Sequence, residues 1–367
     1  MLDRRRLVVG GITVGILVVT LTPTGSGAGQ EFSFCLGCGW RWLSDGLLNV
    51  GLFVPLGMAA GWNARSFWRV LLAGALLSTL IEVTQTMVPG RDPELADIIF
   101  NTLGAACGAI IGYRPRAWLV PSTRAAVRFL VGAVVVMSLV IAGTATLLAP
   151  VVPVGSSGQL ATIAALAKGE ARFRFTAPQV APPITLAPLT YLYDSTYTEW
   201  LAVGRMGNDA VVRYRSRARL FGLDQPDYVA QSVFAGAATT GDAMFVELWR
   251  ESRHWCLRVG ARQDCRVGPT VGRGWSALFY PDAIGQRWGS LIDACWAAAL
   301  LIPLGFWTRR RTVIVTIAGA AVLFALAPAM IGLVPTPLGQ WLGGVIGAAV
   351  GYAASLLVQH RLPSAPS

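Results

Sequence analysis

The sequence predicts an all-α polytopic membrane protein of about eight transmembrane helices with one inserted, extracytoplasmic all-β sandwich domain. Of the 367 residues, 54% are hydrophobic and only 13% are charged, whereas about one quarter of a soluble globular chain is charged. Long apolar runs fill the first 150 and the last 80 positions, and most charged residues fall between about 165 and 285. This order predicts membrane helices, a water-soluble insert, and membrane helices again.

A helix that crosses a bilayer needs about 20 mostly apolar residues. Eight segments meet this need within a few residues at each end: 7–22, 45–62, 68–87, 96–113, 129–149, 291–307, 313–334 and 338–358. The first segment is also similar to a cleavable signal peptide, because three Arg residues precede a short apolar run. The sequence leaves open whether this helix is retained.

Basic residues at the ends of these segments predict the orientation, because Lys and Arg are enriched in cytoplasmic loops. If the eight segments alternate, the same side receives Arg4 to Arg6, Arg65, the cluster at 114–128, the cluster at 309–311 and the tail after 358. We therefore expect a multi-pass protein of the bacterial inner (cytoplasmic) membrane with both termini in the cytoplasm. The formal net charge of +11 lies largely in these clusters, so it predicts no nucleic-acid partner.

Two stretches of the membrane regions repeat. Residues 45–57 align without gaps on 293–305, at an offset of 248 (293 − 45), and both stretches contain Asp and Pro-Leu-Gly. Residues 103–113 align on 342–352, at an offset of 239 (342 − 103). The alignment predicts two parallel four-helix repeats, with the insert in the second.

The insert has the pattern of a β-sandwich, with short aromatic and β-branched runs separated by turn residues. The runs are 172–176, 199–203, 210–214, 244–249 and 254–259. The insert is diffusely similar to the concanavalin-like or laminin-G-like jelly rolls found outside cells. We expect a first membrane unit in 1–150, whose fifth helix belongs to the second repeat, a β domain in 152–288 and a three-helix membrane unit in 289–360.

Cysteines are expected to pair in an exported domain. Cys256 and Cys265 flank a predicted hairpin, so we expect a disulfide between them. Cys35 and Cys38 form a C-x-x-C motif on the same side of the membrane. No thioredoxin-like βαβ pattern surrounds this motif, so a structural disulfide or two free thiols compete with a redox pair.

Polar residues gather in the helices of the first repeat, although a charged side chain near the centre of a membrane helix costs about 2.5–3.5 kcal/mol. Residues spaced by three or four share one helix face, and Arg91 in the connecting loop is the expected partner of a carboxylate. We predict one outward-opening polar pocket from eight residues: Asp45, Asn49, Ser78, Glu82, Gln85, Arg91, Asp97 and Asn101. The alternative is a set of interhelical hydrogen bonds, each contributing about 0.6 kcal/mol.

The second repeat keeps the glycines and loses most of this chemistry. Asp293 stands at the position of Asp45, but Ala297 replaces Asn49. With one gap, the alignment places Pro328 at Glu82 and Gln340 at Asn101. The first repeat is therefore predicted to be the working half.

The joint pattern of these residues resembles the VanZ family of bacterial membrane proteins. It comprises Asn49-x3-Phe53-x-Pro-Leu-Gly57, Ser78-x3-Glu82-x2-Gln85, Arg91, Asp97 and Asn101-Thr-Leu-Gly104. The resemblance covers 45–113 and, in degenerate form, 291–352. The family is named for a member associated with low-level teicoplanin resistance, so the resemblance implies a role in the cell envelope.

We carry two main function hypotheses. In the first, the pocket binds an envelope lipid or a lipid-linked glycan, and the β domain contacts a cell-wall polymer or a protein. In the second, the protein is an intramembrane enzyme acting on a lipid-linked cell-wall substrate, with Glu82 or Asp97 as general base, Asp45 as a second acid or metal ligand, and Arg91 holding a phosphate.

A transporter is a third hypothesis, which the loss of charges from the second repeat disfavours. No zinc motif is present, because His254 and His360 lack suitably spaced partners. The sequence names no cofactor.

The orientation is testable with reporter fusions. A reporter placed after Arg116 or after Arg311 should signal the cytoplasm, and one placed near Asn208 should signal the outside, because the basic clusters favour that arrangement. A cytoplasmic signal at Asn208 would overturn both the orientation and the repeat alignment.

Overall fold

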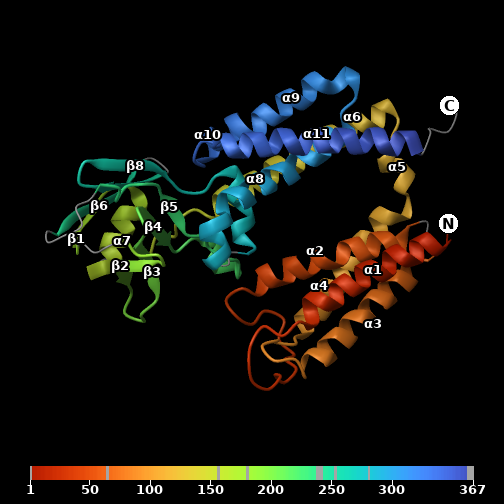
Figure 1. Ribbon diagram of the computed structural model, residues 1–367, viewed down its shortest axis with the longest axis horizontal. Coiled ribbons are helices and arrows are strands. Elements are labelled where there is room, and N and C mark those ends of the chain that lie inside the picture. The colour runs from red at the N-terminus through yellow and green to blue at the C-terminus, as the bar shows by residue number, and fades with distance from the viewer. Residues whose placement is uncertain are drawn as a thin grey trace. The chain divides into compact units, whose positions relative to one another are not determined.

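The structure, a computed structural model, describes residues 2–62, 66–154, 158–178, 182–236, 243–251, 254–279 and 282–361 (Figure 1). Contacts divide the chain into two units, residues 1–124 with 357–367 (unit 1) and residues 125–356 (unit 2), and each is described by itself. Arg65 and the side chain of Arg4, two of the basic residues used to predict orientation, lie outside the described part.

Unit 1 is helical. Its helices are α1 (Leu2–Leu21), α2 (Trp42–Gly61), α3 (Phe67–Gln85), α4 (Leu95–Tyr113) and the short α5 (Pro115–Leu119). The connection between α1 and α2 contains a Cys35–Cys38 disulfide. Because α2 and α4 begin where α3 ends, this connection and residues 86–94 lie at one end of the unit, called here the loop end.

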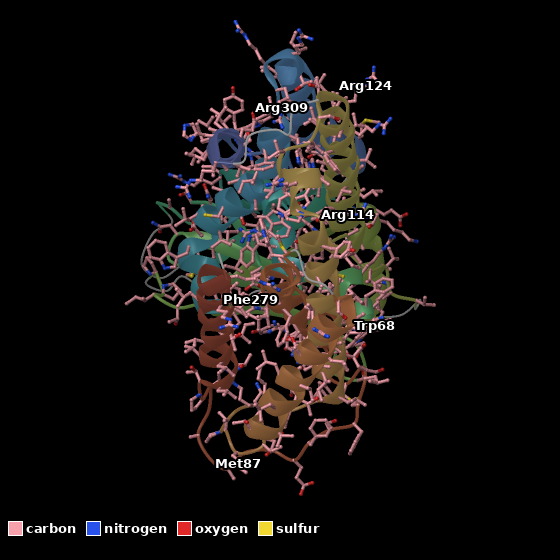
Figure 2. All side chains as sticks on the ribbon, turned by 90° about the vertical axis from the view of Figure 1, so that its right-hand side faces the viewer. Trp68, Met87, Arg114, Arg124, Phe279 and Arg309 are labelled. Carbon is pink, nitrogen blue, oxygen red and sulfur yellow. A yellow bond between two sulfur atoms is a disulfide. The ribbon has the colours of Figure 1, made fainter. Side chains whose placement is uncertain are left out.

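Helix α3 is polar inside and apolar outside. Its buried residues include Ser78, Glu82 and Gln85, whereas Leu72 and Leu76 are 61% and 71% exposed. Trp68 and Met87 also project away from the helices of unit 1 (Figure 2). A soluble helix buries its apolar face, so this reversed pattern indicates a lipid environment around α3.

Glycines let α4 contact α2 backbone to backbone. A Cβ atom on Gly104, Gly108 or Gly112 would lie 2.3, 2.1 or 2.4 Å from the carbonyl oxygen of Val50, Val54 or Met58, respectively. These distances leave no room for a side chain. The small residues of α4 therefore fix the register of the pair, as in other close membrane-helix contacts.

Unit 2 contains a second set of long helices. They are α6 (Thr123–Leu147), α8 (Asp282–Trp307), α9 (Val313–Ala321), the π-helical turn η4 (Val322–Leu326), α10 (Ala327–Ile331) and α11 (Leu338–Arg361). A Cβ on Gly347 or Gly351 of α11 would lie 2.1 Å from the carbonyl oxygen of Ala298 or Ile302 in α8. The pair α8–α11 thus packs in the manner of α2–α4.

These contacts correct the alignment of the second glycine stretch. Val50 and Ala298 correspond at the offset of 248 (298 − 50), and their glycine partners Gly104 and Gly347 differ by 243 (347 − 104). The offset of 239 was wrong by one helical turn, because glycines spaced by four match equally well after a shift of four. If the two stretches are copies of one repeat, this register aligns Gln340 with Asp97 and not with Asn101.

Helices α9 and α10 join through η4, close to a proline. Pro328 has no N–H to donate to the carbonyl four residues earlier, that of Phe324. The hydroxyl of Thr336 donates to this carbonyl oxygen at 2.6 Å. The free acceptor is thereby satisfied.

The insert in unit 2 forms two four-stranded antiparallel sheets. One has the order β1-β6-β7-β8 and the other β2-β3-β4-β5. The strands are β1 (Arg172–Ala177), β2 (Ala187–Tyr193), β3 (Glu199–Met206), β4 (Asp209–Tyr214), β5 (Tyr228–Ala230), β6 (Met244–Glu251), β7 (His254–Val259) and β8 (Arg262–Val267). The five strands expected from the sequence are confirmed as β1, β3, β4, β6 and β7, and β2, β5, β8 and the helix α7 (Gly158–Lys168) were missed.

Both sheets contribute side chains to one hydrophobic core, which includes Val203 and Val212 from one sheet and Val246 and Leu257 from the other. Helix α7 adds Leu166 to this core. A disulfide joins Cys256 of β7 to Cys265 of β8, whose Cα atoms are 3.9 Å apart. The sheets and α7 therefore share one interior.

Seven described segments are long and apolar enough to cross a membrane: α2, α3, α4, α6, α11, Trp288–Trp307 within α8, and Arg310–Ile331. Helix α1 has the length but not the apolar character, because its first turns contain charged residues. The chain is therefore a multi-pass membrane protein, and the eighth span remains a prediction.

The close contact between α2 and α4 predicts opposite effects for two glycine changes. Gly108→Ala should lower the free energy of unfolding by about 1–3 kcal/mol, because the new methyl group meets the Val54 carbonyl. Gly51→Ala meets nothing within 4 Å and should be neutral or stabilising by up to about 1 kcal/mol. Thermal unfolding in detergent measures both, and equal effects would contradict the packing.

Candidate functional site

A cavity of about 460 Å3 lies at the loop end of unit 1. Its wall residues come from two stretches. One stretch, within 38–49, is the end of the α1–α2 connection and the start of α2, and the other, within 85–97, runs from the end of α3 to the start of α4. Backbone hydrogen bonds between Ser33 and both Pro93 and Leu95 fasten the two connections together. The cavity is thus formed by loops held on the ends of packed helices.

Five of the eight predicted pocket residues line this cavity: Asp45, Asn49, Gln85, Arg91 and Asp97. Asn49 hydrogen-bonds to the Asp97 carboxyl, which joins α2 to α4 across the cavity. Asp45, one turn before Asn49, is 56% exposed at its side chain. The carboxylates of α2 and α4 therefore both face the same space.

The other three residues lie behind the wall. Asn101 Nδ2 donates to Ser78 Oγ at 3.0 Å, and both residues are buried. Glu82 is 1% exposed, and its carboxylate accepts from the backbone N–H of Glu94 at 3.1 Å. These contacts tie α3 to α4 and to the loop, so here the interhelical hydrogen-bond interpretation describes the geometry better than the pocket interpretation.

Arg91 has different partners from those expected. Its guanidinium donates to the carbonyl oxygen of Val19 at 2.6 Å and to that of Thr22 at 2.7 and 3.0 Å, at the C-terminal end of α1. Gln85 donates to the carbonyl oxygen of Thr20 at 2.8 Å. The expected pairing of Arg91 with a carboxylate is corrected, because the last carbonyls of a helix need donors and a cation is favourable there.

Sequence reasoning missed several wall residues: Trp40, Arg41, Trp42, Asp92 and Glu94. Arg41, the residue before α2, has its Nη2 3.8 Å from Asp45 Oδ1, so a guanidinium lies one turn before this carboxylate. The i, i+4 spacing of Arg41 and Asp45 was a usable signal. Burial, Asp92 and Asp45 raise the pKa of Glu94 above its usual value.

In unit 2 the two polar residues that the alignment places at Asp45 and Asp97, Asp293 and Gln340, are in contact with another segment of the chain. The 3-10 helix η2 (Val271–Ala277) follows β8 and is bonded to Asp293 in the middle of α8 and to Gln340 in the first turn of α11. Asp293 Oδ1 accepts from Trp275 Nε1 at 2.7 Å, and its Oδ2 lies 3.5 Å from Arg273 Nε. Gln340 accepts from the backbone N–H of Gly272 at 2.9 Å.

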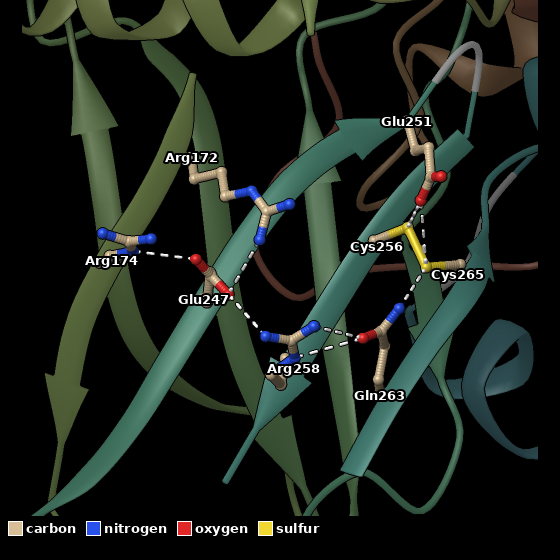
Figure 3. Close-up of polar contacts among 8 residues, drawn as sticks. All are labelled: Arg172, Arg174, Glu247, Glu251, Cys256, Arg258, Gln263 and Cys265. Carbon is tan, nitrogen blue, oxygen red and sulfur yellow. Dashed lines mark hydrogen bonds and ion pairs between the residues drawn. A yellow bond between two sulfur atoms is a disulfide. The ribbon is translucent and has the colours of Figure 1, made fainter. Parts of the chain in front are cut away.

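A second polar group lies on the face of the sheet β1-β6-β7-β8 (Figure 3). Arg174, Glu247, Arg258 and Gln263 are aligned in register across the four strands, and we call this row the arginine ladder. Arg174 Nε and Arg258 Nη1 lie 2.9 and 3.3 Å from the Glu247 carboxylate. The hydrogen bond from Arg174 holds the pKa of Glu247 below its usual value.

Arg172 belongs to the next row and reaches back to Glu247 at 3.5 Å. The ring of Trp249 lies 4.7 Å from the Arg172 guanidinium and 5.2 Å from that of Arg258. One carboxylate therefore faces three guanidinium groups that are 43–60% exposed. A second cavity of about 460 Å3 opens beside this row, lined in part by Arg172, Trp249 and Arg258.

Residues 13–117 match the VanZ/LLP1 family model. The matched segment runs from α1 through α4 into α5 and includes every wall residue of the unit 1 cavity. The VanZ-like resemblance expected from 45–113 is therefore confirmed. No curated protein and no solved structure gives a significant match.

The contacts of Arg91 predict that it anchors α1. Arg91→Gln should lower the free energy of unfolding by about 1.5–3 kcal/mol, the contribution of hydrogen bonds that involve a charged group, and should expose residues 19–24 to protease. Arg69→Gln removes an exposed Arg at the start of α3 and serves as the control. Equal protection of α1 in both variants would show that Arg91 does not hold it.

Proposed function

We propose that this VanZ-like protein binds the polar head group of an envelope lipid or a lipid-linked glycan in the unit 1 cavity. The observation that carries the proposal is a cavity with several ionisable side chains at the end of helices whose outer faces are apolar. Intramembrane ionisable residues are costly and are kept where they serve a function. A lipid head group can enter such a cavity while its acyl chains stay in the bilayer.

The geometry favours binding over catalysis. Glu82, proposed as a general base, is behind the wall and bonded to the Glu94 backbone. Arg91, proposed to hold a phosphate, is bonded to the end of α1. The enzyme hypothesis is left with Asp97 as general base and Asp45 as second acid or metal ligand, since both carboxylates face the cavity. Only an assay for turnover separates the two hypotheses.

We also propose that the chain consists of two four-helix repeats, with the loop end of unit 1 and the β domain on the extracytoplasmic side. The shared glycine contacts of α2–α4 and α8–α11 support the repeat. The basic clusters support the orientation. In this arrangement the cavity opens outward, where envelope precursors and glycopeptides are present, which supports the proposed link to glycopeptide resistance.

The arginine ladder supports a second role, contact between the β domain and an anionic cell-wall polymer. Guanidinium groups bind phosphate and carboxylate oxygens through paired N–H donors. Three guanidinium groups share the Glu247 carboxylate, which gives this group of four side chains a formal charge of +2 (3 − 1). The two sheets with their common core are proposed to form a sandwich that presents this face outside the membrane.

The cavity predicts that Asp97→Asn removes function and leaves the fold intact. The variant keeps the shape and the contact with Asn49 and removes only the charge facing the cavity. Each variant is expressed in a deletion strain. The strain with Asp97→Asn should remain as sensitive to glycopeptides as the deletion strain itself. Glu31→Gln changes an exposed acid outside the cavity wall and should behave as wild type. Loss of folded Asp97→Asn protein in detergent would make the carboxylate structural.

The ladder predicts weaker polymer binding when its charges are removed. Arg174→Gln combined with Arg258→Gln should lower co-sedimentation of full-length protein with purified anionic cell-wall polymer by about tenfold, equal to about 1.4 kcal/mol. Arg262→Gln combined with Arg266→Gln, which removes two exposed Arg of β8 outside the ladder, is the matched control for charge. Equal losses in both proteins would indicate that general charge, and not the ladder, attracts the polymer.

A further inference from the structure

The proposed repeat allows the unit 1 cavity to be compared with the equivalent position in unit 2. In α2 and in α8, the residue with the carboxylate precedes the residue with the contact carbonyl by nine positions. These pairs are Asp45 and Val54 in α2, and Asp293 and Ile302 in α8. In α4 and in α11, the polar residue precedes the contact glycine by eleven positions. These pairs are Asp97 and Gly108 in α4, and Gln340 and Gly351 in α11. Asp293 and Gln340 therefore occupy, on α8 and α11, the places of Asp45 and Asp97 on α2 and α4.

In unit 2 this place is occupied by hydrogen-bond donors of the chain's own η2 segment. Asp293 receives an indole N–H from Trp275 and faces the guanidinium of Arg273. Gln340 receives a backbone N–H from Gly272 and donates to Thr270 Oγ1 at 2.7 Å. A Cβ on Gly272 would lie 2.4 Å from the Gln340 side chain, so the segment fits closely.

In unit 1 the same place is a cavity with more negative charge. Its wall contains four carboxylates, Asp45, Asp92, Glu94 and Asp97, and two guanidinium groups, those of Arg41 and Arg91, for a formal charge of −2 (2 − 4). In unit 2 the Arg273 charge balances that of Asp293. Gln340 in unit 2 has an amide that both donates and accepts, whereas the Asp97 carboxylate at the aligned position of unit 1 can only accept.

We infer that the unit 1 cavity takes a cationic group with N–H donors, an ammonium or a guanidinium, in the place that Arg273 and Trp275 fill in unit 2. The inference rests on the proposed function and adds the chemical class of the head group. Asp97 and Asp45 accept from the occupant, as Gln340 and Asp293 accept from η2. Such a group occurs in amino-phospholipid head groups and in the free amines of lipid-linked glycopeptides.

Native mass spectrometry of the full-length protein in detergent tests this, with three lipids of identical acyl chains as probes. Phosphatidylethanolamine has a cation with N–H donors, phosphatidylcholine has a cation without them, and phosphatidylglycerol has no cation. Wild type should retain phosphatidylethanolamine about tenfold over phosphatidylglycerol, with phosphatidylcholine between them, and Asp97→Asn and Asp45→Asn should lower this preference to about twofold or less. Glu31→Gln should keep the wild-type preference.

Retention of all three lipids at one level, unchanged in Asp97→Asn, would overturn the inference and leave the proposed lipid-binding function in place. Retention of none would overturn the envelope-lipid form of the proposed function, and recognition of a phospholipid amine with it. A further outcome is that magnesium ions at millimolar concentration displace the lipid from wild type and fail to do so in Asp97→Asn. This result would indicate that the cavity binds a metal ion and not an amine, and it would overturn the inference.

Competition identifies the source of the amine. Release of phosphatidylethanolamine by soluble glycerophosphoethanolamine, and not by a lysine-containing tripeptide, supports a lipid head group. The reverse result supports the amine of a lipid-linked peptide. Release by neither soluble amine, with the lipid preference also present in Asp97→Asn, would overturn recognition through the cavity carboxylates.

Discussion

The contact of the α4 backbone with the α2 backbone is the constraint on which the site depends. Gly108 lies so close to Val54 that a methyl group cannot be added between them. At this separation the two helices are locked in register, and Asn49 on one reaches Asp97 on the other. A cavity lined by carboxylates needs walls at a fixed separation, and the backbone contact between α2 and α4 provides this separation. The loops then complete the cavity through their own hydrogen bonds.

The sequence predicts the helices of this structure well because apolar length is a strong signal, and the polar residues because they are exceptional in apolar helices. It does not predict the partner of Arg91, because main-chain carbonyls at the end of α1 have no sequence signature. It also misses β8, whose residues Arg262–Val267 are mostly polar and do not alternate with apolar ones. The three residues of β5 are too few to show a period.

The sequence predicts which helix face each site residue lies on, but it does not predict how far along the helix the cavity extends. A spacing of four places Asn101 and Asp97 on one face of α4, but the distance along the helix decides which of them reaches the cavity. Asn101 is one turn further from the loop end and is bonded to Ser78, whereas Asp97 is in the wall. The glycine repeat has the same weakness, since a pattern that recurs every turn cannot identify which turn is in contact.

The β domain is attached to the helices of unit 2 at three places. Tyr214 donates to the Leu148 carbonyl oxygen at the end of α6, η2 is bonded to α8 and α11, and the ring of His254 lies 3.1 Å from the Leu333 carbonyl oxygen beyond α10. Attachment at several points opposes rotation of the domain about a single linker. Tension applied to the arginine ladder by a bound polymer would therefore be transmitted to the helices α6, α8 and α11 as a mechanical load.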